Sequence, residues 1–409
     1  MYIYKAAVIG GGTMGAGIAQ VISYSGLPVV LREVSDELVQ RALKNAREVY
    51  EGRVKKGKMT PEDLESKMNL ITGTTKMEDL KDADIVIEAV PEKMELKKKI
   101  FQELDQVCSE GAILATNTSA LSISALGSVT KRPEKVVGMH FFFPAHVMKL
   151  IEVIPGIQTA QETVDEVTSF SESLRKVPVK VGECPGFLVN RLLMPYLNEA
   201  VFCLQEGSAT IEEIEQAMVG AGWPMGPFTL VDALGLDVCA EVGKVLVAGY
   251  GERMQPAALW EALITEGRMG RKGGAGFYQY PDAGNPQAVG MQDDLLKQLI
   301  QKVGAKAGAK FSVERLMYGM VNEAVYILQE GISSAADIDM GVVAGLGYPL
   351  DQGGILHYAD QVGVDQILQG LETMERELGP RFHPAYRIRQ MVDAGTLGVK
   401  TKKGFFDYA

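Results

Sequence analysis

The feature that most constrains this chain is a glycine-rich turn near its start. Residues 10–15 read Gly-Gly-Gly-Thr-Met-Gly, directly after the apolar run Ala7–Ile9 and directly before the helical pattern Ile18–Ile22. A strand, a turn of the form Gly-x-Gly-x-x-Gly and a helix, in this order, are typical of the first unit of a dinucleotide-binding domain. The pattern therefore predicts a parallel sheet covered by helices.

Each position of this turn has a physical reason. Gly10 allows the tight turn, Gly12 lets the backbone approach a pyrophosphate, and Gly15 lets the helix pack on the strand. The helix that follows offers unpaired N–H groups and the positive end of its dipole to the phosphates. We therefore expect Gly10, Gly12, Thr13, Met14 and Gly15 to bind a dinucleotide cofactor.

The choice of dinucleotide depends on Glu33, which closes the second predicted strand 18 residues after Gly15. A carboxylate at this position can accept a hydrogen bond from the ribose 2′-hydroxyl and repels a 2′-phosphate. Arg32 beside it acts in the opposite direction. On balance the pair favours NAD over NADP as the cofactor.

The first 180 or so residues alternate short apolar runs with helical patterns, which is typical of an α/β domain with a doubly wound parallel sheet. A long charged stretch, Ser35–Met68, is interrupted by Gly57 and Pro61 and predicts a helical hairpin. We expect the strands to lie at Ala7–Ile9, Val29–Leu31, Ile85–Ile87, Ile113–Ala115, Val136–Met139 and Leu150–Ile154.

After residue 184 the pattern is almost entirely helical, and it occurs twice. Arg191-Leu192-Leu193 recurs as Arg315-Leu316-Met317, and Asn198-Glu199-Ala200 recurs as Asn322-Glu323-Ala324, in each case 124 residues later. Three further matches follow in the same order, so the helical part is a duplicated domain. They are Leu204–Gly207 with Leu328–Gly331, Gly222–Pro224 with Gly347–Pro349, and Gly276–Tyr278 with Gly404–Phe406.

The predicted organisation is a Rossmann-type α/β domain followed by two related all-α domains. The first domain spans residues 1–184 and includes the hairpin, and the first helical domain spans residues 185–281. Residues 282–311 form a linker and the start of the repeat, next to the turn-rich break Pro281–Pro286, and residues 312–409 form a second, degenerate helical copy.

Composition excludes several classes of protein. The formal net charge is −11 and no long basic run is present, so nucleic acid is not expected as a partner. No apolar stretch approaches the length of a membrane span, and the first residues show no secretory signal. The four cysteines form no CxxC pair and the four histidines are scattered, so we expect no metal, reduced thiols and a cytoplasmic location.

Four polar residues stand where strands end or where the helical part begins. They are Ser119, His140, Glu152 and Asn190. Taken singly, Ser119 also fits a helix cap and Asn190 an ordinary helix start. A carboxylate among Leu150–Ile154 must face solvent or find a partner. Together the four residues supply a histidine base, a carboxylate to orient it and two hydrogen-bonding side chains, which suits the oxidation of an alcohol.

At this point the chain resembles the 3-hydroxyacyl-CoA dehydrogenase family over nearly its whole length. The duplicated helical part is similar to the dehydrogenase half of multifunctional fatty-acid oxidation enzymes. The motifs that carry the resemblance occur in the family's order. They are Gly10–Gly15, Glu88–Glu92, Asn117–Ser119, His140 with Glu152, Pro185–Arg191, Trp223–Pro227 and Lys272–Tyr278.

The resemblance implies an NAD-dependent oxidation of (S)-3-hydroxyacyl-CoA to 3-oxoacyl-CoA, in fatty-acid β-oxidation or butyrate-type metabolism. It implies that His140 is the general base, that Glu152 orients it, and that Ser119 and Asn190 hydrogen-bond the substrate or the histidine. Glu92 and Lys97 match positions near the nicotinamide ribose. The resemblance also favours contact between the CoA phosphates and a basic cluster formed by Arg53, Lys55, Lys56 and Lys58, which could equally be a solvated turn.

Two departures from the family pattern leave alternatives open. Phe143 stands where the family usually has Asn, and Glu314 stands in the second copy where the first has Asn190. Phe143 leaves open a second hypothesis, that the chain is a structural or regulatory relative that binds NAD without catalysis. A third hypothesis is a dehydrogenase of a 3-hydroxy acid that is not a CoA ester. The duplication leaves two oligomeric states open: a homodimer, or a monomer in which the second helical copy takes the place of the partner subunit. Association with a hydratase or thiolase also stays open.

Overall fold

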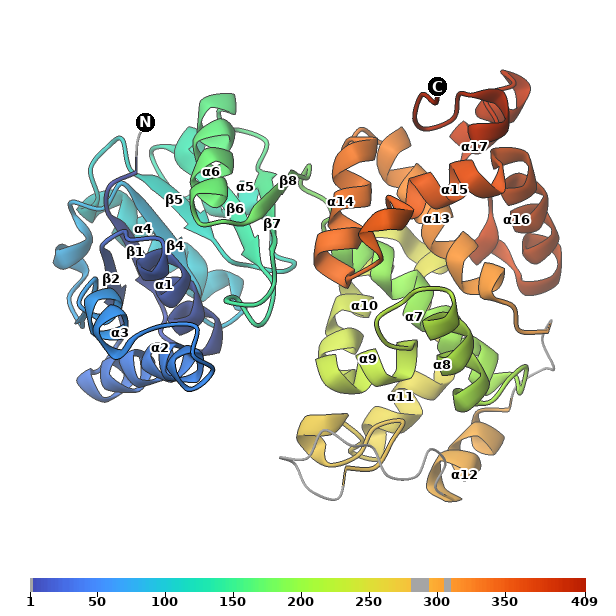
Figure 1. Ribbon diagram of the computed structural model, residues 1–409, viewed down its shortest axis with the longest axis horizontal. Helices are drawn as coiled ribbons and strands as arrows, with labels where there is room; N and C mark the ends of the chain where they lie inside the picture. Colours follow the sequence, from blue (N-terminus) through green and yellow to red (C-terminus); the bar gives the residue numbers. More distant parts are fainter. Residues whose placement is uncertain (1–2, 281–293, 305–309) are drawn as a thin grey trace. The chain divides into compact units, whose positions relative to one another are not determined.

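The chain divides between Glu183 and Cys184 into an α/β unit and an all-helical unit (Figure 1). The computed structural model describes residues 3–280, 294–304 and 310–409. The predicted break at 281–286 and part of the predicted linker therefore lie outside the described residues. The two units are described in turn.

The α/β unit is built from short strands that alternate with helices. Its strands are β1 (Ala6–Ile9), β2 (Val29–Arg32), β3 (Ile71–Thr74), β4 (Ile85–Glu88), β5 (Ile113–Thr116), β6 (Val136–Phe141), β7 (Leu150–Pro155) and β8 (Val177–Lys180). Its helices are α1 (Thr13–Tyr24), α2 (Asp36–Lys55), α3 (Pro61–Met68), α4 (Met94–Val107), α5 (Ile123–Gly127) and α6 (Gln161–Ser173), with short 3₁₀ turns η1 (Met77–Leu80) and η2 (Pro133–Lys135).

These strands form one sheet in the order β3-β2-β1-β4-β5-β6-β7-β8 within the described residues. The neighbours from β3 to β6 are parallel, which confirms the predicted Rossmann-type fold. One pair differs from the predicted parallel sheet, because β7 runs antiparallel to β6. Only eight residues separate these two strands, too few for the crossover that a parallel pair needs.

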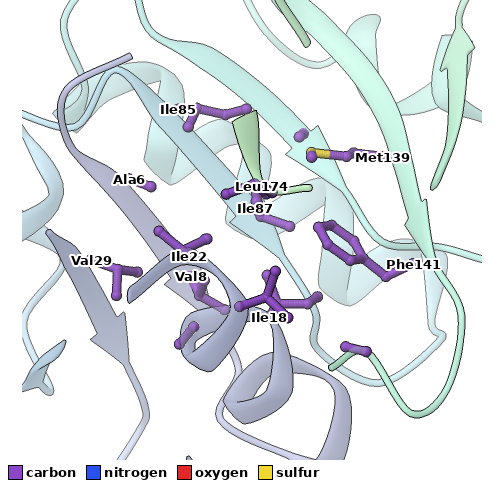
Figure 2. Close-up of a cluster of buried hydrophobic side chains, with 14 of the residues drawn as sticks. Ala6, Val8, Ile18, Ile22, Val29, Ile85, Ile87, Met139, Phe141 and Leu174 are labelled. Carbon is purple, nitrogen blue, oxygen red and sulfur yellow. The ribbon is translucent and has the colours of Figure 1, made fainter. Parts of the chain in front are cut away.

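The strands form where the sequence is aliphatic, because helices cover both faces of a parallel sheet. Every residue of β1, β4 and β5 is buried. Figure 2 shows one face of this core, where side chains of α1 meet those of the central strands and of the end of α6. Its labelled residues are Ala6, Val8, Ile18, Ile22, Val29, Ile85, Ile87, Met139, Phe141 and Leu174.

Helices α2 and α3 occupy the stretch for which a helical hairpin was expected. Ser35 caps α2 by accepting a hydrogen bond from the Leu38 N–H, and Thr60 caps α3 in the same way from Asp63. Between them Gly57 has a φ of 65°, which is the left-handed backbone that ends a helix most easily at glycine. Buried Tyr50 ties α2 to α1 through a hydrogen bond with Ser23.

The second unit is helical and repeats one arrangement. The first copy contains α7 (Val189–Gln205), α8 (Ile211–Gly220), α9 (Pro227–Leu234), α10 (Leu236–Tyr250), η3 (Gly251–Met254), α11 (Ala258–Thr265) and η4 (Arg271–Gly273). Helix α12 (Asp294–Val303) follows it. The second copy contains α13 (Val313–Gln329), α14 (Ala335–Leu346), η5 (Leu350–Gln352), α15 (Ile355–Val362), α16 (Val364–Leu378), η6 (Pro380–Phe382), α17 (Tyr386–Asp393) and η7 (Val399–Thr401).

Two ion-pair clusters join the copies where α7 packs against α13. Arg191 of the first copy donates to Glu323 at 2.6 Å and to Glu330 at 2.7 Å. Arg315 of the second copy donates to Glu199 at 2.6 Å and to Glu206 at 2.7 Å. Each residue is 124 positions from its counterpart, so the contacts are reciprocal, as in the interface of a two-fold symmetric dimer.

Two classes of feature do not occur in the described parts of the chain. No described helix is both long and apolar enough to cross a membrane. The described residues also contain no group of three or more His, Cys, Asp or Glu side chains placed to hold a metal ion.

Candidate active site

The glycine-rich turn joins β1 to α1 and leaves no room for a Cβ at Gly10, Gly11 or Gly15. A Cβ at Gly10, whose φ is 90°, would lie 2.7 Å from the Ala89 carbonyl oxygen, and one at Gly15 would lie 1.7 Å from that of Gly10. A Cβ at Gly12 would meet no protein atom within 4 Å. A glycine is therefore required at position 15 by the packing of α1. The bare backbone at Gly12, in contrast, leaves room for a ligand.

The start of α1 suits a negatively charged group. The residue before the helix is Gly12, no side chain caps the helix, and its first turn carries no acidic residue. The first N–H groups of a helix have no partner inside the helix, and the dipole makes this end positive. A pyrophosphate is the group that such an end binds best.

Glu33 lies at the end of β2, directly beside the turn. Its Oε1 accepts a hydrogen bond from the Gly11 N–H at 2.6 Å, and its Oε2 accepts one from the Val34 N–H at 2.9 Å. These two contacts hold the Glu33 carboxylate next to the glycine-rich turn, where it can accept a hydrogen bond from a ribose hydroxyl. The residues present therefore fit a dinucleotide with an unmodified ribose.

His140 and Glu152 meet across the one antiparallel strand pair of the sheet. The register places them directly opposite each other, and Nδ1 of His140 lies 2.6 Å from Oε2 of Glu152. The side chains are 9% and 1% exposed. A carboxylate in this position accepts a hydrogen bond from Nδ1–H, which fixes the tautomer and directs proton transfer to Nε2.

Neighbouring residues fix the end of β6 on which His140 lies. The Asn117 side chain, just after β5, accepts a hydrogen bond from the Phe141 N–H at 2.8 Å. The ring of Phe142 packs against the imidazole with 4.5 Å between centroids. Phe143, the departure from the family pattern, is 66% exposed.

A second polar network lies at the ends of β4 and β5, and its members were named from the sequence although their mutual contacts were not predicted. Lys97 of α4 is 1% exposed and holds Glu88 at 2.8 Å and Glu92 at 3.3 Å. Glu92, which is 40% exposed, accepts hydrogen bonds from the Thr118 hydroxyl at 2.5 Å and from the Ser119 N–H at 3.0 Å. The signal for these contacts was Glu88, a carboxylate that ends the apolar run Ile85–Ile87 and needs a partner.

The predicted basic cluster is divided in the structure. Lys55, Lys56 and Lys58 are exposed at the end of α2. Arg53, in contrast, lies over the ring of Tyr24 at 4.6 Å and donates a hydrogen bond to the Tyr24 hydroxyl at 2.8 Å.

The structure thus brings His140 and Glu152 into contact, and Ser119 onto Glu92, all within the first unit. Asn190 is the second residue of α7 and belongs to the second unit.

Comparison with protein families identifies both units. Residues 5–184 match the model of the 3-hydroxyacyl-CoA dehydrogenase NAD binding domain. The model of the 3-hydroxyacyl-CoA dehydrogenase C-terminal domain matches residues 186–280 and residues 311–408. NAD is accordingly the dinucleotide for which the turn is built, and the resemblance inferred from the motifs is confirmed.

Curated relatives are longer than this chain. The fatty acid oxidation complex subunit alpha of Shewanella baltica (strain OS185) is 38% identical over 391 residues, which are 95% of this chain and 55% of that protein. The chain therefore spans about half the length of the curated relatives it matches.

Two solved structures of 3-hydroxybutyryl-CoA dehydrogenases are similar to this chain. The 3-hydroxybutyryl-CoA dehydrogenase of Escherichia coli K12 covers 97% of this chain and 100% of its own, with 31% identity and a TM-score of 0.87. The (S)-3-hydroxybutyryl-CoA dehydrogenase of Ralstonia eutropha covers 69% of this chain and 100% of its own, with 41% identity and a TM-score of 0.67.

Proposed function

This chain belongs to the 3-hydroxyacyl-CoA dehydrogenase family, and we propose that it catalyses the reversible, NAD-dependent oxidation of (S)-3-hydroxyacyl-CoA to 3-oxoacyl-CoA. The observation that carries the proposal is the buried pair of His140 and Glu152 at the carboxyl edge of a dinucleotide-binding sheet. Ligands of open α/β sheets bind at this edge.

His140 is the general base of the proposed reaction. Its Nε2 takes the proton of the 3-hydroxyl group, while Glu152 on Nδ1 keeps the ring oriented and stabilises the imidazolium that forms. The glycine-rich turn and Glu33 would hold NAD⁺, which would supply the acceptor for the hydride of C3. In the reverse direction His140 returns the proton to the 3-oxo oxygen.

The other polar residues bind and position the ligands. Ser119 and Asn190 hydrogen-bond the substrate oxygens or the histidine, and Lys55, Lys56 and Lys58 contact the CoA phosphates. Glu92 contacts the nicotinamide ribose because it is the exposed member of its network.

Lys97 belongs to the same network but is almost fully buried. It serves the cofactor site by holding Glu92 in place. The proposed roles of Glu92 and Lys97 thus differ in what they touch: the ribose in one case, a carboxylate in the other.

The reciprocal ion pairs support the monomer of the two oligomeric states that the duplication leaves open. Because the second copy presents to the first the same contacts that a symmetric partner would, the chain is a monomer in this proposal. The name of the curated relatives, subunit alpha of a fatty acid oxidation complex, supports a place in fatty-acid β-oxidation and an association with other subunits, which we propose to be a hydratase or thiolase. The four free cysteines favour a cytoplasmic location.

The test is NADH consumption by the purified chain with acetoacetyl-CoA, repeated with NADPH and with free acetoacetate. We expect rapid turnover with NADH and the CoA ester alone. Equal rates with free acetoacetate would contradict the CoA substrate. Binding of NADH without any turnover of acyl-CoA esters of several chain lengths would contradict the enzymatic proposal.

The catalytic pair is tested by replacement. His140→Ala lowers kcat by about a thousandfold, because general-base catalysis contributes on the order of 10² to 10⁴. Glu152→Gln lowers it by about a hundredfold, because an amide donor favours the wrong tautomer of the imidazole. NADH affinity, measured by fluorescence, stays within about twofold in both variants and serves as the control. A Glu152→Gln enzyme with full activity would remove Glu152 from the mechanism.

A further inference from the structure

A small basic pocket lies in the α/β unit, away from the glycine-rich turn. Its volume is about 170 Å³, several times the roughly 30 Å³ that one water molecule occupies in the liquid. Four parts of the chain line it: the end of α1, the second half of α2, the connection between β6 and β7, and the connection between α6 and β8. The residues used below are Tyr24, Arg53, His146, Lys149, Arg175 and Lys176.

Five of these six side chains are basic, and the described lining contains no carboxylate. None of the five has a carboxylate within ion-pair distance among the residues that the structure describes. This differs from the rest of the unit, where buried Lys97 and Arg132 are each paired with a carboxylate. Lys149 and Arg175 are exposed and screened by solvent, whereas Lys176 is buried and Arg53 partly buried, so the repulsion between these like charges is offset most where an anion joins them in the pocket.

The protein holds two of the cations in place. Arg53 donates a hydrogen bond to the Tyr24 hydroxyl at 2.8 Å, and its buried Nε has no partner among the described residues. Nζ of Lys176 donates to the carbonyl oxygens of Ala145 and Met148, at 2.5 and 2.6 Å. A buried donor without a partner is costly, and an acceptor in the pocket would remove that cost.

Arg175 is held in a third way. Its guanidinium carbon lies 5.6 Å from the centroid of the Tyr24 ring, so that Tyr24 contacts the guanidinium groups of both Arg53 and Arg175. Arg175 also has a φ of 61°, an uncommon value for a residue other than glycine. Arg175 directly follows the C-cap of α6, Leu174, and the N–H groups of Arg175 and Lys176 bond to the carbonyls of Glu172 and Ser171, so the helix ending sets this backbone and the position of Arg175 at the pocket.

The titration of two groups agrees with a surplus of positive charge. Burial lowers the pKa of His146, and the charges of Lys176, Arg53 and Lys56 lower it further. Burial and the nearby Lys149 lower the pKa of Lys176 to about 8. A bound anion would oppose both effects.

We propose that this pocket is a binding site for a phosphate group. Guanidinium and ammonium groups are the side chains that bind phosphate oxygens most strongly, and Arg53, Lys149 and Arg175 offer both kinds around a volume large enough for a tetrahedral oxyanion. Either of two molecules supplies this group: the CoA ester, in which case the inference rests on the proposed function, or free phosphate. The site itself depends on neither.

The experiment measures binding of inorganic phosphate to the full chain by isothermal titration calorimetry at constant ionic strength. Lys149→Gln combined with Arg175→Gln removes two exposed cations and leaves Arg53 and Lys176 to hold the structure. We expect saturable binding to the unmodified chain and a dissociation constant about tenfold higher in the double variant. Lys149→Gln alone gives an intermediate value and guards against misfolding of the double variant.

A matched control is Lys81→Gln combined with Lys99→Gln, which removes the same net charge from exposed positions outside the pocket. Its dissociation constant stays unchanged. Equal weakening in both double variants would show that phosphate responds to net charge only and would overturn the proposal. Absence of saturable binding to the unmodified chain would overturn it as well.

Kinetics then identify the source of the phosphate. If the pocket takes a phosphate of the CoA ester, Lys149→Gln with Arg175→Gln raises KM for acetoacetyl-CoA with little change in kcat, and inorganic phosphate competes with the ester. If it takes free phosphate, KM is unchanged although phosphate binding is lost. Either result supports the site. A chain that binds phosphate but turns over no substrate would refute the proposed function and leave the pocket proposal intact.

Discussion

The two helical copies keep the same structural contacts but begin differently. Asp232 in the first copy accepts hydrogen bonds from the backbone N–H groups of Phe277 and Tyr278 and from the Tyr280 hydroxyl. In the second copy Asp360 has the same three kinds of partner, at Phe405, Phe406 and Tyr408. The buried carboxylate that fastens the end of each copy has thus been retained twice.

The starts of α7 and α13 show the difference. Helix α13 has an ordinary beginning, with Ser312 as its cap and Glu314 in its first turn. No side chain caps α7, and the residues before it include Gly186 and Phe187 with φ values of 76° and 50°. The first copy carries Asn190 where the second carries Glu314. The comparison teaches that contacts which stabilise the fold were kept in both copies, while the unusual backbone and the candidate catalytic side chain occur in only one.

The largest expected effect comes from breaking the contacts that join the copies. Arg191→Met removes the buried guanidinium between Glu323 and Glu330, leaves Glu323 with Arg253 as its remaining partner, and lowers the free energy of unfolding by about 3 kcal/mol. Arg315→Met has a similar effect because its contacts are the reciprocal ones. Urea denaturation measures both, with the exposed Lys244→Gln as the control. A large loss in one variant and none in the other would break the equivalence of the copies.

Replacing Asp232 and Asp360, the buried carboxylates that hold the end of each copy, compares the stability of the two copies directly. Asp232→Ala leaves two buried N–H groups without a partner and lowers the free energy of unfolding by about 2–3 kcal/mol. Asp360→Ala costs less, about 1–2 kcal/mol, because Phe405 and Phe406 are only half-buried and water can replace the lost acceptor. Thermal unfolding of the two variants side by side tests the order. The reverse order would contradict this argument from burial.

The candidate catalytic position is expected to matter in one copy alone. Asn190→Ala lowers kcat/KM for acetoacetyl-CoA by about tenfold to a hundredfold, as loss of one hydrogen bond to a reacting group does. Glu314→Ala, at the equivalent position of the second copy, leaves kcat/KM unchanged. Steady-state kinetics of the pair, with NADH affinity as the check on folding, decides the matter. Equal losses in both variants would mean that the second copy also takes part in the reaction.

The smallest effect concerns the helix cap. Ser312→Ala removes the side chain that accepts a hydrogen bond from the Arg315 N–H and lowers the free energy of unfolding by about 1 kcal/mol. Leu188→Ser at the start of α7 does not stabilise the protein by a similar amount, because Leu188 is fully buried and its apolar contacts are lost. Urea denaturation compares the two variants. A more stable Leu188→Ser chain would show that α7 lacks only a cap.

Local patterns allowed much of the α/β unit to be predicted. The glycine-rich turn, the aliphatic strands and the hairpin stretch each carry their signal in a few neighbouring residues, and the structure has strands or helices at all of them. Strands β3 and β8 were missed. Their sequences, Ile71–Thr74 and Val177–Lys180, contain glycine, proline or lysine and lie at the two edges of the sheet, where the apolar signal is weak.

The site was predicted as a set of residues and only partly as a geometry. His140 and Glu152 were chosen by residue type and by resemblance, but their contact depends on the reversal of β7, which the sequence analysis did not foresee. The network of Lys97 with Glu88 and Glu92 joins residues of β4, α4 and the loop between them, and only their packing shows which carboxylate Lys97 holds.

The sequence by itself determined the class of fold, the dinucleotide turn and the duplication, because each of these is written in the periodicity or spacing of neighbouring residues. The tertiary structure decided which charges meet. Arg53 stands beside Lys55 in the sequence, yet it turns onto Tyr24 and into the basic pocket, while Lys55 remains exposed. The reciprocal pairs of Arg191 and Arg315 likewise join residues more than 100 positions apart. Side-chain electrostatics depends on distance in space, and only the packed chain sets that distance.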